Sequence, residues 1–279
     1  MRVCATPLLI KIENVALFCI GVCMSAAVSG PSEIRISVVV PCWNDALALE
    51  RLLISMRTIR GIDEIIVADA SSDEHREAVK AVCVAGVSLV WCTRPNRGAQ
   101  MNAGAGVATG DVLLFQHCDS TLCQDHLDAL REAMRDEALV GGAFHRLFDE
   151  RHKTLRGLEC VGRWYHQYGG VLFGDQSVFV RRAVFERMGG FKEFPLMEDV
   201  DFSCRLRRMG PLRVLDPPLG TSARRHLRRG SWRTSIHNGW LLLLFRLGVS
   251  PVRLHQMYYR GRSEGDSAHK RLSPPAQIP

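Results

Sequence analysis

The chain has 279 residues, enough for one large α/β domain or two small ones with a substantial buried core. Hydrophobic residues make up 47% and charged residues 23%, which excludes a chain that is disordered over most of its length. The formal net charge is +7, and arginines are concentrated between Arg181 and Arg233. That region should attract an anionic partner, such as a diphosphate, a lipid headgroup or nucleic acid, unless it is simply a solvated basic face.

The first 33 residues are expected to form an N-terminal extension, signal-like or disordered, that precedes the folded domain. Residues 15–30 are apolar and end in small residues, which is typical of a signal peptide or an anchor. The run is short for a membrane span, however, and Glu13 lies where a signal peptide is basic. A start codon placed too early explains the same segment equally well, so the three alternatives stay open.

The ten cysteines favour a reducing compartment, because the sequence contains no C-x-x-C pair and several cysteines lie inside apolar segments. The segment HCDSTLCQDH offers two histidines and two cysteines, but its spacing is not that of a common zinc finger. Strand alternation also points Cys118 away from His117. Zinc is therefore not expected here.

Strand and helix patterns alternate along the first half of the chain. Strands are predicted over residues 34–41, 64–69, 87–92 and 111–117. The helical segments between them are DALALERLLISMRTIR, SSDEHREAVKAV and AQMNAGAGVAT, and the first has an apolar face made of Leu49, Leu52, Leu53, Met56 and Ile59. This alternation predicts an α/β fold with a mostly parallel sheet and helices on both faces.

Polar residues follow two of these predicted strands. Asp69 ends the second strand, and His117 and Asp119 end the fourth. Ligands of parallel α/β sheets bind at the carboxyl ends of the strands, so we expect a binding site at this edge. Asp69 alone also fits a turn before ASSD, but two acidic strand ends at one edge favour the site.

Five segments, taken in order, resemble the motifs of family 2 glycosyltransferases with the GT-A (Rossmann-like) fold. They are SVVVPCWND, EIIVADASSDE, RPNRGAQMNAGAGVATGDVLLFQHCD, VFVRRAVFERMGGF and EDVDFSCRLRRMG. The resemblance covers residues 34–235, and within the family it is closest to a bacterial branch found beside radical-SAM genes and linked to arsenosugar biosynthesis. It implies transfer of one sugar from a nucleotide-sugar donor to an acceptor hydroxyl or carboxylate, with inversion and metal assistance.

The resemblance also implies which residues contact the donor. The family usually places an Asp-x-Asp pair after the fourth strand, but His117 stands here at the first position, leaving Asp119 as the only carboxylate. Asp119, with His117, would hold Mn²⁺ or Mg²⁺, which can manage with one or two protein ligands because the donor phosphates supply others. His117 alternatively contacts ribose or phosphate. The expected donor-binding residues are Pro41, Asp69, Arg97, Gln100, Asn102, Asp119, Arg224 and Arg225.

Catalysis is expected at the segment PLMEDVDFSCRL. By resemblance, Asp199 would be the base that takes the acceptor proton, and Glu198 would position the acceptor. Acidic residues at a helix start are also favoured by the helix dipole, which is the structural alternative. Asp175 and Gln176, expected at the start of a strand, are candidates for the acceptor side.

The sequence lacks the Gln-x-x-Arg-Trp signature of processive synthases, so transfer of a single sugar is expected. An apolar helix over 236–260, in the core or at a membrane interface, and a disordered tail over 261–279 would complete the chain. The acceptor would be a small or lipid-like molecule, not nucleic acid. The expected location is the cytoplasm, including the inner face of the cell membrane. The alternatives are a noncatalytic relative or a nucleotidyltransferase, but PCWND stands where the latter needs a Gly-rich loop with an arginine.

Overall fold

The computed structural model divides into two compact units, Met1–Glu33 and Ile34–Pro279. It describes residues 34–148 except residue 85, residues 169–221 and 231–260, and three single residues, 157, 162 and 165. The predicted extension over 1–33 and the predicted tail over 261–279 lie outside the described residues, as do Arg224 and Arg225.

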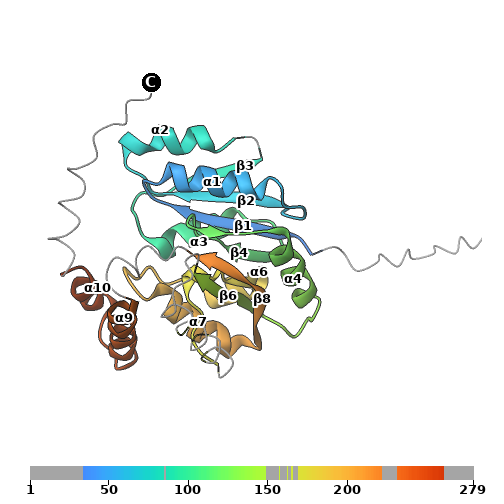
Figure 1. The fold of residues 1–279 in the computed structure, drawn as a ribbon. Coiled ribbons are helices and arrows are strands. Elements are labelled where there is room, and N and C mark those ends of the chain that lie inside the picture. The colour runs from blue at the N-terminus through green and yellow to red at the C-terminus, as the bar shows by residue number, and fades with distance from the viewer. Residues whose placement is uncertain are drawn as a thin grey trace, which may run out of the picture. The chain divides into compact units, whose positions relative to one another are not determined.

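The first half of the sheet is parallel (Figure 1). Its strands are β1 (Ile36–Cys42), β2 (Glu64–Asp69), β3 (Val87–Trp91) and β4 (Val112–Phe115), in the order β3-β2-β1-β4. The connecting helices are α1 (Ala46–Met56), α2 (Asp73–Val82) and α3 (Arg97–Val107). All four predicted strands are confirmed, with bounds that differ by one or two residues, and α3 begins at Arg97, which the sequence placed in a loop.

The second half makes the sheet mixed. It contains β5 (Ser120–Thr121), α4 (Gln124–Met134), β6 (Gly141–Phe148), η1 (Gly174–Gln176), β7 (Phe179–Arg181), α6 (Arg182–Met188), α7 (Glu198–Met209) and β8 (Leu212–Thr221). The full order is β3-β2-β1-β4-β7-β6-β8-β5, in which β7 is antiparallel to β4 and β6, β6 and β8 are parallel, and β5 is antiparallel to β8. The predicted mostly parallel sheet is therefore confirmed.

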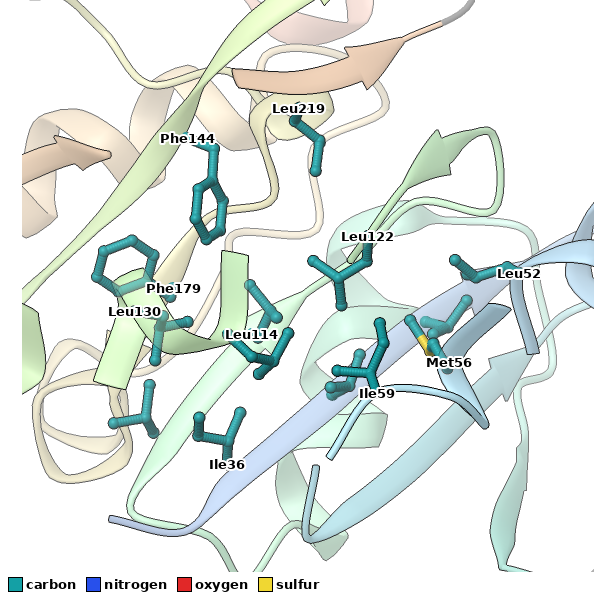
Figure 2. Packing of buried hydrophobic residues seen from close by; sticks show 14 of the residues in the cluster. Ile36, Leu52, Met56, Ile59, Leu114, Leu122, Leu130, Phe144, Phe179 and Leu219 are labelled. Atoms are coloured by element: carbon teal, nitrogen blue, oxygen red, sulfur yellow. The ribbon is translucent and has the colours of Figure 1, made fainter. Parts of the chain in front are cut away.

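Helices cover both faces of this sheet, as predicted. Alternate residues of β1 point to opposite faces, so that Val38 and Val40 belong to one apolar cluster and Val39 to the other. The first cluster includes side chains from α1, α2 and α4. Figure 2 shows Leu52 and Met56 of α1 and Leu130 of α4 among them. The second includes side chains from α3, α6 and α7. The predicted apolar face of the first helical segment is confirmed, because all five of its residues belong to the first cluster.

A carboxylate joins the amino ends of β1 and β2. Glu64 Oε1 accepts hydrogen bonds from Ser37 Oγ at 2.5 Å, from the Thr109 backbone N–H at 2.6 Å and from the Gly110 N–H at 3.1 Å. Burial alone would raise the pKa of Glu64, but the hydrogen bonds from Ser37, Thr109 and Gly110 outweigh it and lower that pKa. Glu64 therefore ties two strands to the loop that leads from α3 to β4.

The apolar helix expected over 236–260 is two helices, α9 (Ser231–Arg246) and α10 (Pro251–Arg260). α9 ends before Gly248, whose φ of 88° is a left-handed conformation that favours glycine, and Pro251 then begins α10. Leu241 and Leu254 are buried. Among the helices that the structure describes, none has both the length and the apolar content required to cross a bilayer.

Candidate functional site

A buried amide shapes the turn that follows β4. Gln116 Nε2 donates to the carbonyl oxygens of His117 at 3.2 Å and Ser120 at 3.0 Å, and its Oε1 accepts from Ser177 Oγ at 2.6 Å. Gln116 is fully buried, whereas Asp119 is exposed. The turn therefore holds Asp119 toward solvent just beyond the carboxyl end of β4. No sequence pattern singled out Gln116 as a site residue.

The start of α7 carries the two predicted catalytic acids. Met197 caps this helix with a left-handed φ of 67°, and Glu198 and Asp199 are its first two residues. Asp199 Oδ1 accepts from the Val200 N–H at 2.8 Å, and Asp199 Oδ2 accepts from the Gly174 N–H at 2.9 Å. Two backbone donors thus fix the orientation of the Asp199 carboxylate.

Arg97, at the first turn of α3, lies among the acidic side chains. Its Nη1 is 3.2 Å from Glu198 Oε1. Desolvation by the surrounding protein would lower the pKa of Arg97, but the nearby carboxylates raise it above its ordinary value. Those carboxylates are Glu198, Asp199, Asp119 and Asp175. Five residues predicted from separate motifs therefore share one electrostatic environment.

The pKa values of the two α7 acids are raised. Burial raises the pKa of Glu198, the charge of Asp199 adds to this, and Arg97 opposes it. Burial also raises the pKa of Asp199, against the hydrogen bond from Gly174 and the charge of Arg97. A carboxylate with a raised pKa binds a proton more tightly, which suits a general base that must still be ionised near neutral pH.

Asp175 is held by an arginine that sequence analysis missed. Its Oδ2 is 2.6 Å from Arg146 Nη1 on β6. Burial would raise the pKa of Asp175, but the charge and hydrogen bond of Arg146, with the charges of His117 and Arg97, lower it. Asp175 Oδ1 is buried and makes no hydrogen bond to any residue in the described part of the chain.

Gly174 brings His117 and Asp199 close together. A Cβ added at Gly174 would lie 3.1 Å from His117 Nε2 and 3.5 Å from Asp199 Oδ2. The two side chains therefore flank the same backbone position. A larger residue at 174 would press on the His117 ring, which gives a physical reason for glycine here.

The position of Gln176 corrects the expected strand start at 175–176. Residues 174–176 form the 3₁₀ turn η1, and β7 begins at Phe179. The side chain of Gln176 is buried, donates to the Phe144 carbonyl at 3.0 Å and accepts from the Phe173 N–H at 2.9 Å. Of the two predicted acceptor-side residues, the structure places only Asp175 with the charged cluster.

Two predicted donor residues are engaged at the carboxyl ends of β1 and β2. Asp69 is fully buried, and its two oxygens accept from the hydroxyl of Ser71 at 2.6 Å and from the Ser71 N–H at 3.2 Å. Gln100 Nε2 donates to the carbonyls of Cys42 at 2.7 Å and Ala68 at 2.9 Å. The Asp69 carboxylate and the Gln100 amide therefore hold the backbone in place at the carboxyl ends of β1 and β2.

Two further predicted donor residues, Asn102 and Pro41, make hydrogen bonds to neighbouring segments. Asn102 exchanges two hydrogen bonds of 2.8 Å with the backbone of Phe191, in the segment that leads to α7. Pro41 lies in β1 opposite Ala68, and its carbonyl accepts from Cys118 Sγ at 3.5 Å. In the described part of the chain, no hydrogen bond joins the side chain of Asn102 or the carbonyl of Pro41 to the acidic side chains of the charged cluster.

The chemistry of the cluster fits a divalent cation that prefers oxygen. Four carboxylates face two guanidinium groups, those of Arg97 and Arg146, so acidic side chains outnumber the guanidinium groups in the cluster. In the described residues, no three His, Cys, Asp or Glu side chains are grouped closely enough to hold a metal by themselves. Asp119 and His117 would therefore supply a minority of the ligands, with phosphate oxygens of a donor supplying others.

The sequence of this chain was compared with family models and with known proteins. The sequence model of the family described as glycosyl transferase family 2 matches residues 37–215. An uncharacterized protein of Mycobacterium tuberculosis is 26% identical over 227 residues, covering 70% of this chain and 68% of that protein. An uncharacterized glycosyltransferase of Nostoc sp. is 27% identical over 127 residues, covering 43% of this chain but only 39% of that protein.

Solved structures share the fold at low sequence identity. The mannosyltransferase PcManGT from Pyrobaculum calidifontis, in complex with GDP-Man and Mn²⁺, has a TM-score of 0.58 and 19% identity, over 88% of this chain and 78% of that one. S. aureus TarS 1-349 has a TM-score of 0.53 and 14% identity, over 86% and 76% of the two chains. Its complex with UDP-GlcNAc matches with the same TM-score and 16% identity, over 68% of this chain and 58% of that one.

Proposed function

Because the chain belongs to glycosyl transferase family 2, we propose that it transfers one hexose-type sugar from a nucleotide-sugar donor to an acceptor hydroxyl or carboxylate. The observation that carries this proposal is the gathering of Arg97, Asp119, Asp175, Glu198 and Asp199 in one charged cluster. Structural relatives with GDP-Man and UDP-GlcNAc support a nucleotide-sugar as the donor.

Donor binding is assigned to the β4 side of the cluster. Asp119 and His117 would hold Mn²⁺ or Mg²⁺, which neutralises the charge that develops on the leaving diphosphate. The Mn²⁺ in the PcManGT complex supports this assignment. Arg97 lies beside the same carboxylates and supplies a fixed positive charge. Pro41, Asp69 and Gln100 would shape the donor pocket, and Asn102 would support it through the backbone of Phe191. Arg224 and Arg225, outside the described residues, would approach the diphosphate.

The chemical step is assigned to Asp199. Its carboxylate accepts the proton of the acceptor hydroxyl while the acceptor oxygen forms a bond to the anomeric carbon. The bond between that carbon and the diphosphate oxygen breaks, and the nucleoside diphosphate leaves with the electron pair. One base and no assigned covalent nucleophile make direct displacement with inversion the simplest mechanism.

Glu198 and Asp175 are assigned to the acceptor. Glu198 is paired with Arg97, so its position is fixed relative to the donor side. Asp175 is held by Arg146 and lies in the same charged cluster as Glu198 and Asp199, which supports a position on the acceptor side. The motif resemblance supports the branch linked to arsenosugar formation, with a small or lipid-like acceptor.

The proposal is tested by combining donor binding with turnover. A panel of nucleotide-sugars is screened by thermal shift with and without Mn²⁺, because only ligands that bind the native state raise the midpoint. The donor that gives the largest metal-dependent shift is then tested for sugar transfer to candidate acceptors. Donor binding without transfer to any acceptor would favour the noncatalytic alternative. Release of pyrophosphate from a nucleoside triphosphate and a sugar phosphate would instead favour a nucleotidyltransferase.

A further inference from the structure

The helix α9 carries an apolar stripe on its exposed side. Ile236, Trp240, Leu243 and Leu247 are 69%, 53%, 47% and 71% exposed. Ile236, Trp240 and Leu243 are spaced four and three residues apart and lie on one face of α9, and Leu247 continues this spacing in the turn after Arg246. An exposed tryptophan with three large aliphatic side chains on one face is unusual for a surface that meets only water.

The opposite side of α9 already has its partners within the protein. Leu241 is buried, and the ring of Phe245 lies 6.5 Å from that of Phe194 in an edge-to-face arrangement. α9 and α10 pack against each other (Figure 1). The ring of His237 stacks on that of Tyr258 at 6.2 Å. The exposed stripe is therefore a second apolar face, additional to the one that attaches the helix.

The charge around this stripe has one sign. From Pro217 to Ser263 the sequence contains no Asp or Glu, and its arginines are Arg224, Arg225, Arg228, Arg229, Arg233, Arg246, Arg253, Arg260 and Arg262. Arg246 and Arg253 are exposed next to the stripe in sequence. Apolar side chains together with unopposed positive charge complement a surface that is anionic outside and apolar beneath.

We infer that the α9–α10 pair docks the protein on an anionic lipid membrane, with the α9 stripe entering the interface and the exposed Arg246 and Arg253 contacting the headgroups. Trp240 is suited to this position because an indole combines an apolar ring with a polar N–H. The two helices lie on the surface and do not span it. Such docking would keep the protein at the membrane surface without any change at the charged cluster.

The test is vesicle co-sedimentation of the full-length protein. Vesicles of phosphatidylcholine alone are compared with an equimolar mixture of phosphatidylcholine and phosphatidylglycerol. We expect binding to the anionic vesicles to be tighter by about tenfold or more, and to weaken as salt is raised. Equal binding to both compositions, or no binding to either, would overturn the inference.

Two double variants test whether vesicle binding depends on the α9 stripe or on any pair of exposed apolar side chains. Leu243→Ser/Leu247→Ser is expected to weaken anionic vesicle binding by about tenfold. The matched control is Leu47→Ser/Ile54→Ser on α1, whose side chains are 58% and 54% exposed and which should bind as the parent does. Equal binding by the stripe variant and the parent, or equal loss in both variants, contradicts the inference. A lipid-free dimer that light scattering detects in the parent and not in the stripe variant would assign the stripe to a second copy instead.

Discussion

Asp199 is oriented by two backbone N–H groups, those of Val200 and Gly174, and not by another side chain. Asp199→Asn keeps the shape of the side chain but removes the proton acceptor. We therefore expect donor affinity to survive while transfer falls by about 10²–10⁴-fold. Steady-state kinetics and donor titration on the same preparation measure both quantities.

Asp201→Asn is the matched control for that variant, since Asp201 lies two residues further along α7. Its carboxylate is paired with Lys192 Nζ at 3.0 Å and Arg205 Nε at 2.6 Å, so its loss should lower stability with little change in turnover. The anomeric proton signal of the product reports the stereochemistry. Retention of configuration, or an Asp199→Asn enzyme as fast as the parent, would reject the assignment of Asp199 as base.

A single substitution also tests the proposed role of Asp119 in binding a divalent cation. Asp119→Asn should abolish metal-dependent donor binding and turnover together, because the amide lacks the charge that holds a divalent cation. Asp111→Asn is the control: Asp111 lies at the other end of β4 and pairs with Arg35. Calorimetric donor titrations with Mn²⁺ and with EDTA make the comparison. Identical donor affinity of parent and Asp119→Asn in both conditions argues against a metal at this position.

For single residues, the sequence pointed to those that end strands or begin helices, because these positions have recognisable sequence patterns. Asp119 follows an apolar run, and Glu198 begins an acidic helix start. Arg146 and Gly174 have no such signal. Their importance arises from the tertiary approach of β6, η1 and α7, which brings Arg146 to Asp175 and Gly174 to Asp199.

At the scale of elements, Asn102 connects α3 to the segment before α7. Asn102→Ala would leave the N–H and the carbonyl of Phe191 without their partner, at an expected cost of about 1–3 kcal/mol in the free energy of unfolding. Donor affinity of the folded variant should change little, because the amide is occupied within the protein. Asn238→Ala, on the exposed side of α9, is the control and should be nearly neutral. A large loss of donor affinity with unchanged stability would instead assign Asn102 to the donor pocket.

The Glu64 carboxylate makes stability depend on pH. Its pKa is lowered from 4.5 in the folded protein, so it stabilises the fold above that value and this contribution is lost as pH falls through the lowered folded pKa. Glu64→Gln should lower the free energy of unfolding at pH 7 by about 1 kcal/mol, a modest value because the partly exposed site is screened by solvent.

The difference between parent and Glu64→Gln should shrink as the pH falls below 4.5, because the parent carboxylate then also becomes neutral. Denaturant melts across pH 3 to 7 provide the measurement. Glu132→Gln serves as the control, since the exposed Glu132 on α4 pairs with the exposed Arg135 and should show little pH-dependent effect. A stability difference that is constant with pH would mean that the charge of Glu64 is not the cause.

The elements also differ in how far the sequence predicts them. β1 and β4 are buried on both faces and read as continuous apolar runs with clear ends, so they were predicted. β2 and β3 are less buried, but their apolar segments also have clear ends in the sequence. β6 begins with Gly141 and Gly142, which lie so close to β7 and β8 that a Cβ at either would collide with a backbone oxygen of Phe179 or Arg213. That requirement comes from the neighbouring strands, and local sequence does not reveal it.

At the scale of the whole molecule, the charged cluster and the sheet belong to the unit Ile34–Pro279. Deleting residues 1–30 should therefore leave a folded protein with unchanged donor affinity, because β1 begins at Ile36. Circular dichroism and donor titration of the truncated and full-length proteins test this. A truncated protein that is insoluble or inactive, beside a full-length protein that is neither, would show that the deleted segment belongs to the fold.

The position of β7 has a consequence for how the chain is made. β4 lies inside the sheet between β1 and β7, but β7 comes from Phe179–Arg181, long after β4 has left the ribosome. During that interval the hydrogen-bonding edge of β4, with its four buried apolar residues, has no neighbour on one side. Uncovered apolar edges pair readily with other chains, so the half-made protein is most prone to aggregate before β7 emerges. Slow translation between residues 115 and 179 should consequently lower the soluble yield even though the finished protein is unchanged.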